Sequence, residues 1–288
     1  MKLNILYEDT HLLVCFKPAG VPVQSAGVGR EDCVSILKNY FYEQRAAVQA
    51  SDRAKSAGAQ KLQAGGHGTG QSQGTKVVGQ QEPYVGVVHR LDQPVEGVLV
   101  FAKTPFAAKE LSRQVTDGTM QKYYLALCKL ENSGSGKRGK PVHIVDNVDN
   151  HVENSKILED FLLKNGKTNT SQVVSAKTKD AKLARLEYWT LSCENSRKLV
   201  KIKLITGRHH QIRVQMAHHG TPLVGDTKYN PHPVETDDVD KYGGKGYGVA
   251  LCAYRLELIH PKSGKLLSFE VCPEHRLLKE AYEDFSKK

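Results

Sequence analysis

The chain has 288 residues, of which 39% are hydrophobic and 25% charged, and a formal net charge of +10. This composition excludes a collagen-like or wholly disordered protein, and no apolar run approaches the ~18 residues that a membrane span needs. The N-terminus carries acidic residues where a secretory signal would need its apolar stretch, so we expect a soluble cytoplasmic protein with no membrane contact. An excess of basic residues is typical of proteins that bind nucleic acid, although it also serves solubility alone.

The N-terminal part predicts two short strands, over 3–7 and 12–16, and then a break at a segment that contains Pro and Gly. Residues 31–42 place apolar side chains at helical spacing. The composition then changes, because 43–81 is rich in Gln, Gly, Ala and Ser and contains no aromatic residue. We expect a flexible insertion there, with a frayed helix over its first part at 43–57.

The middle of the chain predicts strands on both sides of a polar loop, 89–97, and a helix that starts at the N-cap Thr104 and ends at Gly118. A second flexible loop, basic in composition, is expected at 131–140, whereas 141–181 has too weak a periodicity to predict any element. The other predicted strands lie over 85–88, 98–102, 123–128, 186–192, 198–205, 249–259 and 266–271, and the other predicted helices over 209–219 and 277–285. Hairpins interspersed with helices favour an α+β fold with a largely antiparallel sheet over a doubly wound fold.

The loop 89–97 carries the first candidate for chemistry. Asp92 follows His89 and Arg90, and nearby cations lower the pKa of a carboxyl group, so Asp92 is expected to stay ionised. Such a carboxylate acts as a nucleophile, or it supports a cation that forms at the anomeric carbon of a sugar. The alternative is an aspartate that caps a turn or pairs with Arg90.

The segment 196–213 contains no acidic residue, and it carries Lys201 and Lys203 on a predicted strand and Arg208 just before a predicted helix. A basic strand followed by a helix N-terminus suits phosphate groups. The alternative is a solvated basic face. The histidine pairs at 209–210 and 218–219 lack Cys or carboxylate partners at ligand spacing, so we expect no metal site.

Lys122, Tyr123 and Tyr124 lie on a predicted strand. A tyrosine there stacks on a splayed-out base if the strand borders a basic cleft, and otherwise it packs in the core. The chain has no Gly-rich phosphate loop, no dinucleotide fingerprint, no serine nucleophile elbow and no Cys-x-x-Cys pair. We therefore expect chemistry that needs no cofactor.

Five groups of segments form a pattern along the ordered part of the sequence. They are 5–9 with 14–20, His89-Arg90-Leu91-Asp92 with 97–100, Lys122-Tyr123-Tyr124 with 125–127, 206–214 with 222–226, and 253–261 with Gly264. In this order they resemble the motifs of the RluA-type family of RNA pseudouridine synthases. One four-residue match would be weak, whereas five in register are strong.

This resemblance implies a single catalytic domain over 1–288 whose central mixed, mainly antiparallel sheet and flanking helices form an RNA-binding cleft. The protein is then expected, as a monomer without metal or cofactor, to isomerise uridine to pseudouridine in structured ribosomal or transfer RNA. Asp92 would be the catalytic aspartate, Tyr124 would stack on the target uracil and help finish the reaction, and Arg213 would pair with Asp92 and hold it ionised. The residues expected to bind RNA are His89, Arg90, which would assist base flipping, Lys122, Lys201, Lys203, Arg208, His210 and Gln211.

Three residues depart from the common family pattern. Val95 and Glu96 stand where Thr and Ser are usual, and His209 replaces a usual Thr. Glu96 is expected to place an acid close to the RNA cleft. Because the chain starts directly at the opening motif, we expect target selection without the S4 RNA-binding domain that some relatives carry. The alternative function is an RNA-binding or RNA-folding factor with the same fold and weak or lost catalysis, but the three catalytic residues are retained.

Overall fold

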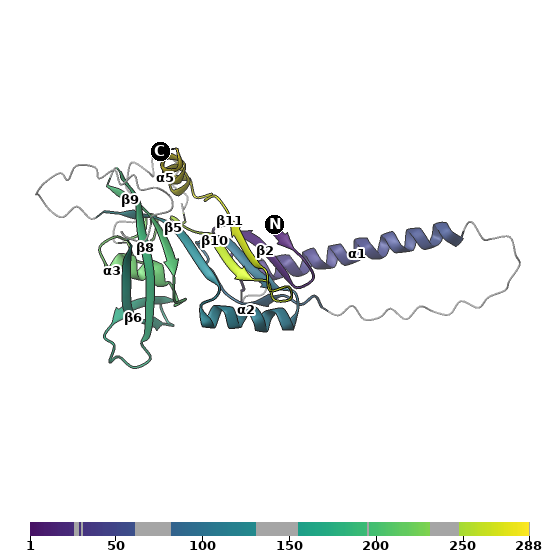
Figure 1. Cartoon of the computed structure of the whole chain (residues 1–288), viewed down its shortest axis with the longest axis horizontal. Helices are drawn as coiled ribbons and strands as arrows, with labels where there is room; N and C mark the ends of the chain where they lie inside the picture. Colours follow the sequence, from purple (N-terminus) through teal and green to yellow (C-terminus); the bar gives the residue numbers. More distant parts are fainter. Residues whose placement is uncertain are drawn as a thin grey trace, which may run out of the picture.

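An 11-stranded sheet runs through the described chain in the order β1-β2-β4-β10-β5-β9-β8-β6-β7, with β3 beside β4 and β11 beside β10 (Figure 1). All strand pairs are antiparallel except β4 with β10, which confirms the predicted mixed, mainly antiparallel α+β fold. The computed structural model describes residues 1–25, 29, 31–60, 82–130, 155–194, 196–230 and 248–287, and for 52–60 only the backbone. The elements are β1 (Asn4–Glu8), β2 (Leu12–Lys17), α1 (Cys33–Gln60), β3 (Gly86–Val87), β4 (Glu96–Ala102), α2 (Pro105–Asp117), β5 (Gln121–Lys129), β6 (Lys156–Asn165), β7 (Thr170–Val174), β8 (Lys182–Glu194), β9 (Arg197–Leu204), α3 (Gln211–His218), β10 (Leu251–Ile259), β11 (Leu266–Glu270) and α5 (Arg276–Ser286).

Successive side chains of each strand point to opposite faces of the sheet. Helices pack against the side chains of both faces. On β2, Leu13 and Cys15 pack in a cluster with residues of α1 and α3. The neighbouring Leu12 and Val14 pack instead with residues of α2, and α5 joins a third cluster built on β5 and β9. The start of α3 therefore lies on the same face as Tyr124, which belongs to the first cluster.

The predicted helix between Thr104 and Gly118 is confirmed together with its caps. The Thr104 hydroxyl accepts the backbone N–H of Ala107, Pro105 occupies the first turn, and Gly118 ends the helix in the left-handed conformation at φ 78°. Local chemistry alone is enough to set both ends of α2.

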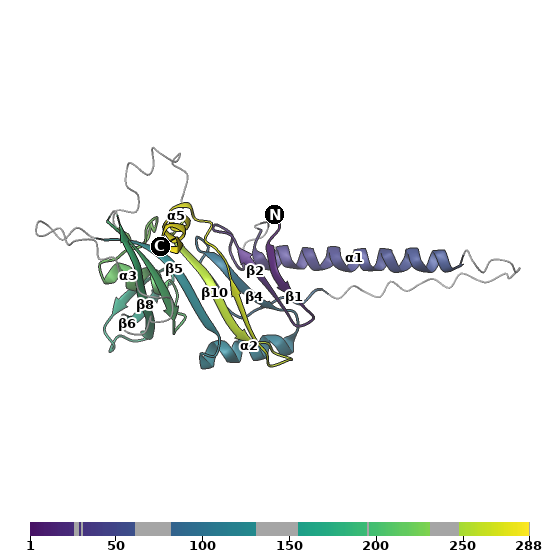
Figure 2. The ribbon, with the colours of Figure 1, turned by 45° about the horizontal axis from the view of Figure 1, so that its top comes forward.

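Helix α1 begins where the sequence predicts a helix and continues to Gln60 as one element. Cys33, Leu37 and Phe41 pack in the core, whereas the side chains of 43–51 are exposed. Figures 1 and 2 both show this second part of the helix projecting away from the sheet. The first part of the predicted flexible insertion is thus helical, and 61–81 lies outside the described residues. No helix in the described ranges is both long and apolar enough to cross a membrane.

Two strands occupy the segment 141–181, for which the sequence predicted no element. β6 and β7 form a hairpin at the edge of the sheet, and β6 also pairs with β8. Only Leu158 and Leu162 of β6 are buried, so its alternation of apolar and polar residues is weak. The loop predicted at 131–140 lies outside the described residues.

Gly97 allows the one parallel pairing of the sheet. Its φ is +127°, and an added Cβ would lie 2.3 Å from the carbonyl oxygen of Ala253 on β10. Only glycine tolerates both this conformation and this approach. The close contact fixes β4 against β10 and so anchors the C-terminal end of the loop 89–97.

Candidate active site

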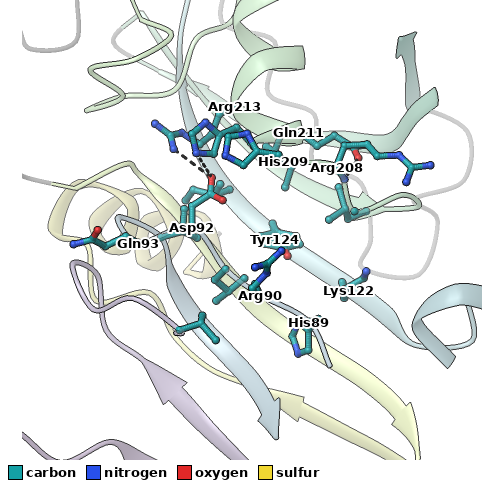
Figure 3. Close-up of a pocket in the computed structure, with 18 of the residues that line it drawn as sticks. His89, Arg90, Asp92, Gln93, Lys122, Tyr124, Arg208, His209, Gln211 and Arg213 are labelled. Atoms are coloured by element: carbon teal, nitrogen blue, oxygen red, sulfur yellow. Dashed lines mark hydrogen bonds and ion pairs between the residues drawn. The ribbon is translucent and has the colours of Figure 1, made fainter. Parts of the chain in front are cut away.

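A cavity of about 710 Å³ opens on the face of the sheet that carries Tyr124. Its walls come from segments that are far apart in the sequence: the loop after β3, strand β5, the tip of the β6–β7 hairpin and the start of α3 (Figure 3). The predicted site residues that line it are Asp92, Tyr124, Arg213, His89, Arg90, Lys122, Arg208, His210 and Gln211, and Lys164, Asn169 and His209 line it as well.

Asp92 is held at the cavity wall by Arg213. The Arg213 Nη1 donates to Oδ2 of Asp92 at 3.2 Å, and its Nε and Nη2 bind the two carboxylate oxygens of Asp226 at 2.7 Å each. Arg213 and Asp226 are buried, whereas the Asp92 side chain keeps 26% of its surface exposed. The buried Arg213–Asp226 pair therefore presents one guanidinium nitrogen to Asp92.

Burial raises the pKa of Asp92 above its ordinary value, and the charge and hydrogen bond of Arg213 oppose that rise. The negative charge of Asp226 adds to the rise. The expectation that neighbouring cations would lower the pKa of Asp92 is thus wrong in its net direction. Arg213 offsets part of a desolvation cost that the sequence did not reveal.

Tyr124 forms part of the cavity floor. It lies on β5 opposite Ile202 of β9 and is 6% exposed. Figure 3 shows its ring between Asp92 and Lys122. Burial and the charge of Asp92 raise the pKa of the Tyr124 hydroxyl, so the phenol stays protonated at neutral pH.

The comparisons with known proteins identify the family of the chain. The family model described as RNA pseudouridylate synthase matches residues 11–218. The chain belongs to this family. A ribosomal large subunit pseudouridine synthase D of Nitrosomonas europaea is 31% identical over 93% of the chain and 61% of its own length. The protein of the same name from Pseudomonas aeruginosa is 28% identical over 94% of the chain and 68% of its own length.

Solved structures show the same fold. The human RNA pseudouridylate synthase domain containing 4 superposes with a TM-score of 0.62 at 20% identity, covering 96% of this chain and 92% of that one. The human domain containing 1 gives a TM-score of 0.58 at 18% identity. The pseudouridylate synthase fold expected from the sequence motifs is therefore present.

Some of the predicted RNA contacts already use their polar side-chain atoms within the protein. The Nε2 of His89 accepts the backbone N–H of Val100 at 3.3 Å, and burial lowers the pKa of His89 to about 3. The Gln211 Oε1 accepts the backbone N–H of Arg208 and the hydroxyl of Thr206. Both side chains border the cavity, but their polar atoms already stabilise β4 and the start of α3.

Lys201 and Lys203 do not line the cavity. On β9 they alternate with Ile202, so they lie on the face opposite to Tyr124. The ammonium of Lys201 lies 5.7 Å from the ring centroid of Tyr123 and 5.6 Å from that of Trp189. Their predicted role in RNA binding stays a prediction, and it would have to be played on the face of the sheet opposite to Asp92, because the period of a strand does not say which face meets a substrate.

Val95 lines the cavity, whereas Glu96 does not. Glu96 is buried, and its Oε1 accepts the backbone N–H groups of Glu274 and His275 just before α5. Val95 packs in the main core. The carboxylate of Glu96 is therefore next to the cavity in sequence but does not line it, since it holds the segment before α5 on the sheet.

Sequence reasoning missed two charged residues that support the site. Asp226, the partner of Arg213, has no exposed surface. Lys17 is equally buried and lies below the Asp92 loop, where its Nζ donates to the carbonyl oxygens of Pro18, Val21 and Gln93. Burial lowers the pKa of Lys17 to about 8. Lys17 and Asp226 both lie within the matched motifs, but no local pattern predicts burial of a charge.

No group of three or more His, Cys, Asp or Glu side chains within the described ranges is placed to hold a metal ion. The histidine pair at the end of α3 makes a different contact, because the Nε2 of His219 lies 3.1 Å from Oδ2 of Asp160. The pair at the start of α3 borders the cavity.

Proposed function

We propose that this protein isomerises uridine to pseudouridine within RNA and that Asp92 is the residue that acts on the ribose. The observation that carries the proposal is the Asp92 carboxylate, presented by Arg213 at the wall of a basic cavity beside the ring of Tyr124. Membership of the pseudouridylate synthase family supports it.

The reaction breaks the bond between N1 of uracil and C1′ of ribose, forms a bond from C5 of uracil to C1′, and moves the C5 proton to N1, so that no atom is gained or lost. Asp92 serves either as a nucleophile at C1′ or as an anion beside a cation at C1′. Both roles need an ionised carboxylate, which the hydrogen bond from Arg213 favours. Tyr124 offers its ring for stacking on the released base.

The cavity supplies the means to hold a flipped nucleotide. A base inside a helix cannot reach a side chain on the cavity wall, so the target nucleotide must leave its stack. Arg90 and Lys164 are exposed at the cavity, and they have no side-chain hydrogen bond or ion pair with the residues that the structure describes. We assign them to RNA phosphates, with Lys122 deeper in the cavity beside Tyr124.

For the substrate, we propose RNA of the large ribosomal subunit, because several relatives that span most of this chain are named for it. Transfer RNA is the second candidate. The protein is proposed to act in the cytoplasm and as a monomer. Gel filtration of the purified chain tests the oligomeric state.

The experiment compares the wild type with Asp92→Asn on transcripts of large-subunit ribosomal RNA and of transfer RNA, with pseudouridine measured by mass spectrometry. The variant is expected to bind RNA with nearly unchanged affinity and to form no pseudouridine, because the amide is isosteric but is neither a nucleophile nor an anion. Asp180→Asn is the matched control, since Asp180 is exposed. Turnover by Asp92→Asn would refute the role of Asp92. A wild type that binds both RNAs and modifies neither would favour the RNA-binding or RNA-folding factor.

A further inference from the structure

A row of hydrogen-bonding groups connects the β6–β7 hairpin with Asp92. The backbone N–H of Ser171 donates to the hydroxyl oxygen of Tyr229 at 2.7 Å. That oxygen lies 2.7 Å from Nδ1 of His210. The other ring nitrogen of His210, Nε2, lies 3.7 Å from Oδ2 of Asp92. His210 thus stands between a tyrosine that does not line the cavity and the carboxylate that does.

The backbone of His210 is unusual for its residue type. It adopts the left-handed conformation at φ 54°, directly before α3, and its side chain makes no capping hydrogen bond there. A non-glycine residue held in this region marks a constraint that other contacts stabilise. The imidazole is buried and lies near Asp92 at the cavity. The left-handed backbone therefore serves to direct the ring toward Asp92.

Packing fixes the plane of the His210 ring from two sides. The ring of His209 is stacked on it, with centroids 3.8 Å apart and planes 23° apart. Tyr229 contacts it edge-on, with centroids 5.6 Å apart and planes 85° apart. His209 is itself held by Asn169 and Ser171, whose side-chain oxygens lie 3.1 Å from its Nε2 and 2.9 Å from its Nδ1. The imidazole of His210 therefore cannot turn over without breaking these contacts.

The Tyr229 hydroxyl on one side of the ring and the Asp92 carboxylate, an acceptor, on the other favour a proton on one particular nitrogen of His210. Burial raises the pKa of Tyr229, so its hydroxyl keeps a single proton. Because its oxygen already accepts the N–H of Ser171, that proton is free to be donated to Nδ1 of His210. Burial and the charge of Arg213 lower the pKa of His210 to about 3, so the ring is neutral at neutral pH. A neutral ring that accepts at Nδ1 carries its proton on Nε2, the nitrogen that faces Asp92.

We propose that His210 is a positioning residue for Asp92, held by Tyr229 as the tautomer protonated on Nε2, whose N–H is directed at Oδ2 of Asp92. Arg213 donates to the same oxygen. Within the described chain, Oδ1 has no hydrogen-bond partner, so the two donors leave it for the ribose. The separation of 3.7 Å is longer than a hydrogen bond, and such contacts tighten when substrate binds. The consequence for catalysis rests on the proposed function, whereas the tautomer does not.

The first test is spectroscopic and needs no turnover. The ¹⁵N shifts of the histidine ring nitrogens are measured on the labelled full chain, and His210 is assigned by its loss in His210→Gln. The wild type is expected to show a protonated Nε2 and an unprotonated Nδ1 at pH 7. Tyr229→Phe removes the donor to Nδ1 and is expected to give a mixture of tautomers. Tyr40→Phe is the matched control, since it removes a hydroxyl that binds Glu8 instead. A proton on Nδ1 in the wild type, or an unchanged spectrum in Tyr229→Phe, would overturn the assignment.

The second test uses catalysis. His210→Gln keeps an amide N–H near the position of Nε2, whereas His210→Leu has no donor, and neither side chain is β-branched, so both meet a similar cost in the left-handed conformation. His210→Leu is expected to lower kcat roughly 10- to 100-fold, as supporting residues around a reactive group commonly do, with KM little changed. His210→Gln is expected to recover much of that loss. Equal losses in the two variants, or a loss in KM alone, would assign His210 to packing or RNA binding and overturn its positioning role. A wild type without turnover would refute the proposed function and leave the tautomer result standing.

Discussion

Asp92 and Arg213 form a charged pair at the cavity wall, where only the Asp92 side chain is partly exposed to water. Removing a carboxylate from water costs free energy, and this cost appears as a raised pKa of Asp92. Arg213 offsets it, but Arg213 is itself buried and needs Asp226. The three side chains therefore act as a unit in which each charge is tolerated because of another.

Replacing Arg213 with Ala is expected to move the acid limb of the activity profile to higher pH. The reaction needs ionised Asp92, and Arg213 lowers the pKa of Asp92 against the effect of burial. Without Arg213 the pKa rises further, so the carboxylate becomes protonated at a higher pH and activity is lost earlier on acidification. The shift is measured from single-turnover rates over a pH range of ~2 units on each side of neutrality.

The same change removes the charged partner of the buried Asp226, which then keeps only the backbone N–H groups of Lys228 and Tyr229 as donors among the described residues. Such a loss costs about 3–5 kcal/mol of stability for a buried charge. The double variant Arg213→Ala with Asp226→Asn removes this buried charge and so separates the two effects. It is expected to regain stability in urea titrations while keeping the shifted pH profile. An unshifted profile with weaker RNA binding would assign Arg213 to the RNA backbone instead.

At the scale of elements, strand ends and helix ends are tied together by single side chains. Glu96 at the start of β4 binds the backbone just before α5, and Gly97 beside it allows β4 to pair with β10. Loop 89–97 is therefore attached at its C-terminal end to two elements from the far end of the chain. The position of Asp92 depends on these long-range contacts as well as on its neighbours in sequence.

Glu96→Ala is expected to destabilise the fold by about 1.5–3 kcal/mol, the range for hydrogen bonds to a charged group. Glu96→Gln keeps an acceptor oxygen and is expected to lose less. Because Glu96 is buried away from the cavity, neither variant is expected to change the salt dependence of RNA binding. Urea titration measures the stability, and fluorescence titration measures RNA binding. Tighter RNA binding by Glu96→Gln would show that the charge of Glu96 acts on the RNA in the cleft.

The projecting part of α1 is expected to be dispensable for folding. Its side chains over 43–51 are exposed, and closing a shorter loop changes the entropy by only ~0.6 kcal/mol per doubling of length. Replacing 46–80 with a short Gly/Ser linker is expected to preserve the melting temperature and turnover on a short RNA, and to raise KM on a large structured RNA. Phe41→Ala, in the buried part of α1, is the contrasting change and is expected to cost about 3–5 kcal/mol. A shortened protein that aggregates would show that the segment is structural.

At the scale of the whole molecule, the fold brings basic side chains from separate segments to one cavity. Arg90 comes from the loop after β3, Lys164 from the β6–β7 hairpin and Arg208 from the turn before α3. The sheet also separates basic residues, since Lys201 and Lys203 lie on its other face. Basic residues of the described chain thus lie on both faces of the sheet, and only one of these faces holds Asp92.

The salt dependence of RNA binding is expected to distinguish these faces. Each phosphate contact that is lost on single-stranded RNA lowers the slope of log K against log salt by about 0.7. Arg90→Met with Lys164→Met is expected to flatten the slope by up to twice that amount. Lys201→Met with Lys203→Met, which removes the same number of charges, is expected to leave the slope unchanged. The reverse result would show that RNA binds the opposite face.

The sequence by itself determined the elements whose signals are local. The caps of α2, the alternation along β9 and the start of α1 all follow from residues within a few positions of one another, and the motif around Asp92 indicated the family. Only the tertiary structure decided which face of β9 meets the cavity, that Glu96 holds α5, and that Asp226 and Tyr229 support Arg213 and His210. The reason is physical: the period of a strand or helix tells which side chains share a face. What that face packs against, and therefore which charges are buried and which pKa values move, is set by segments far away in the chain.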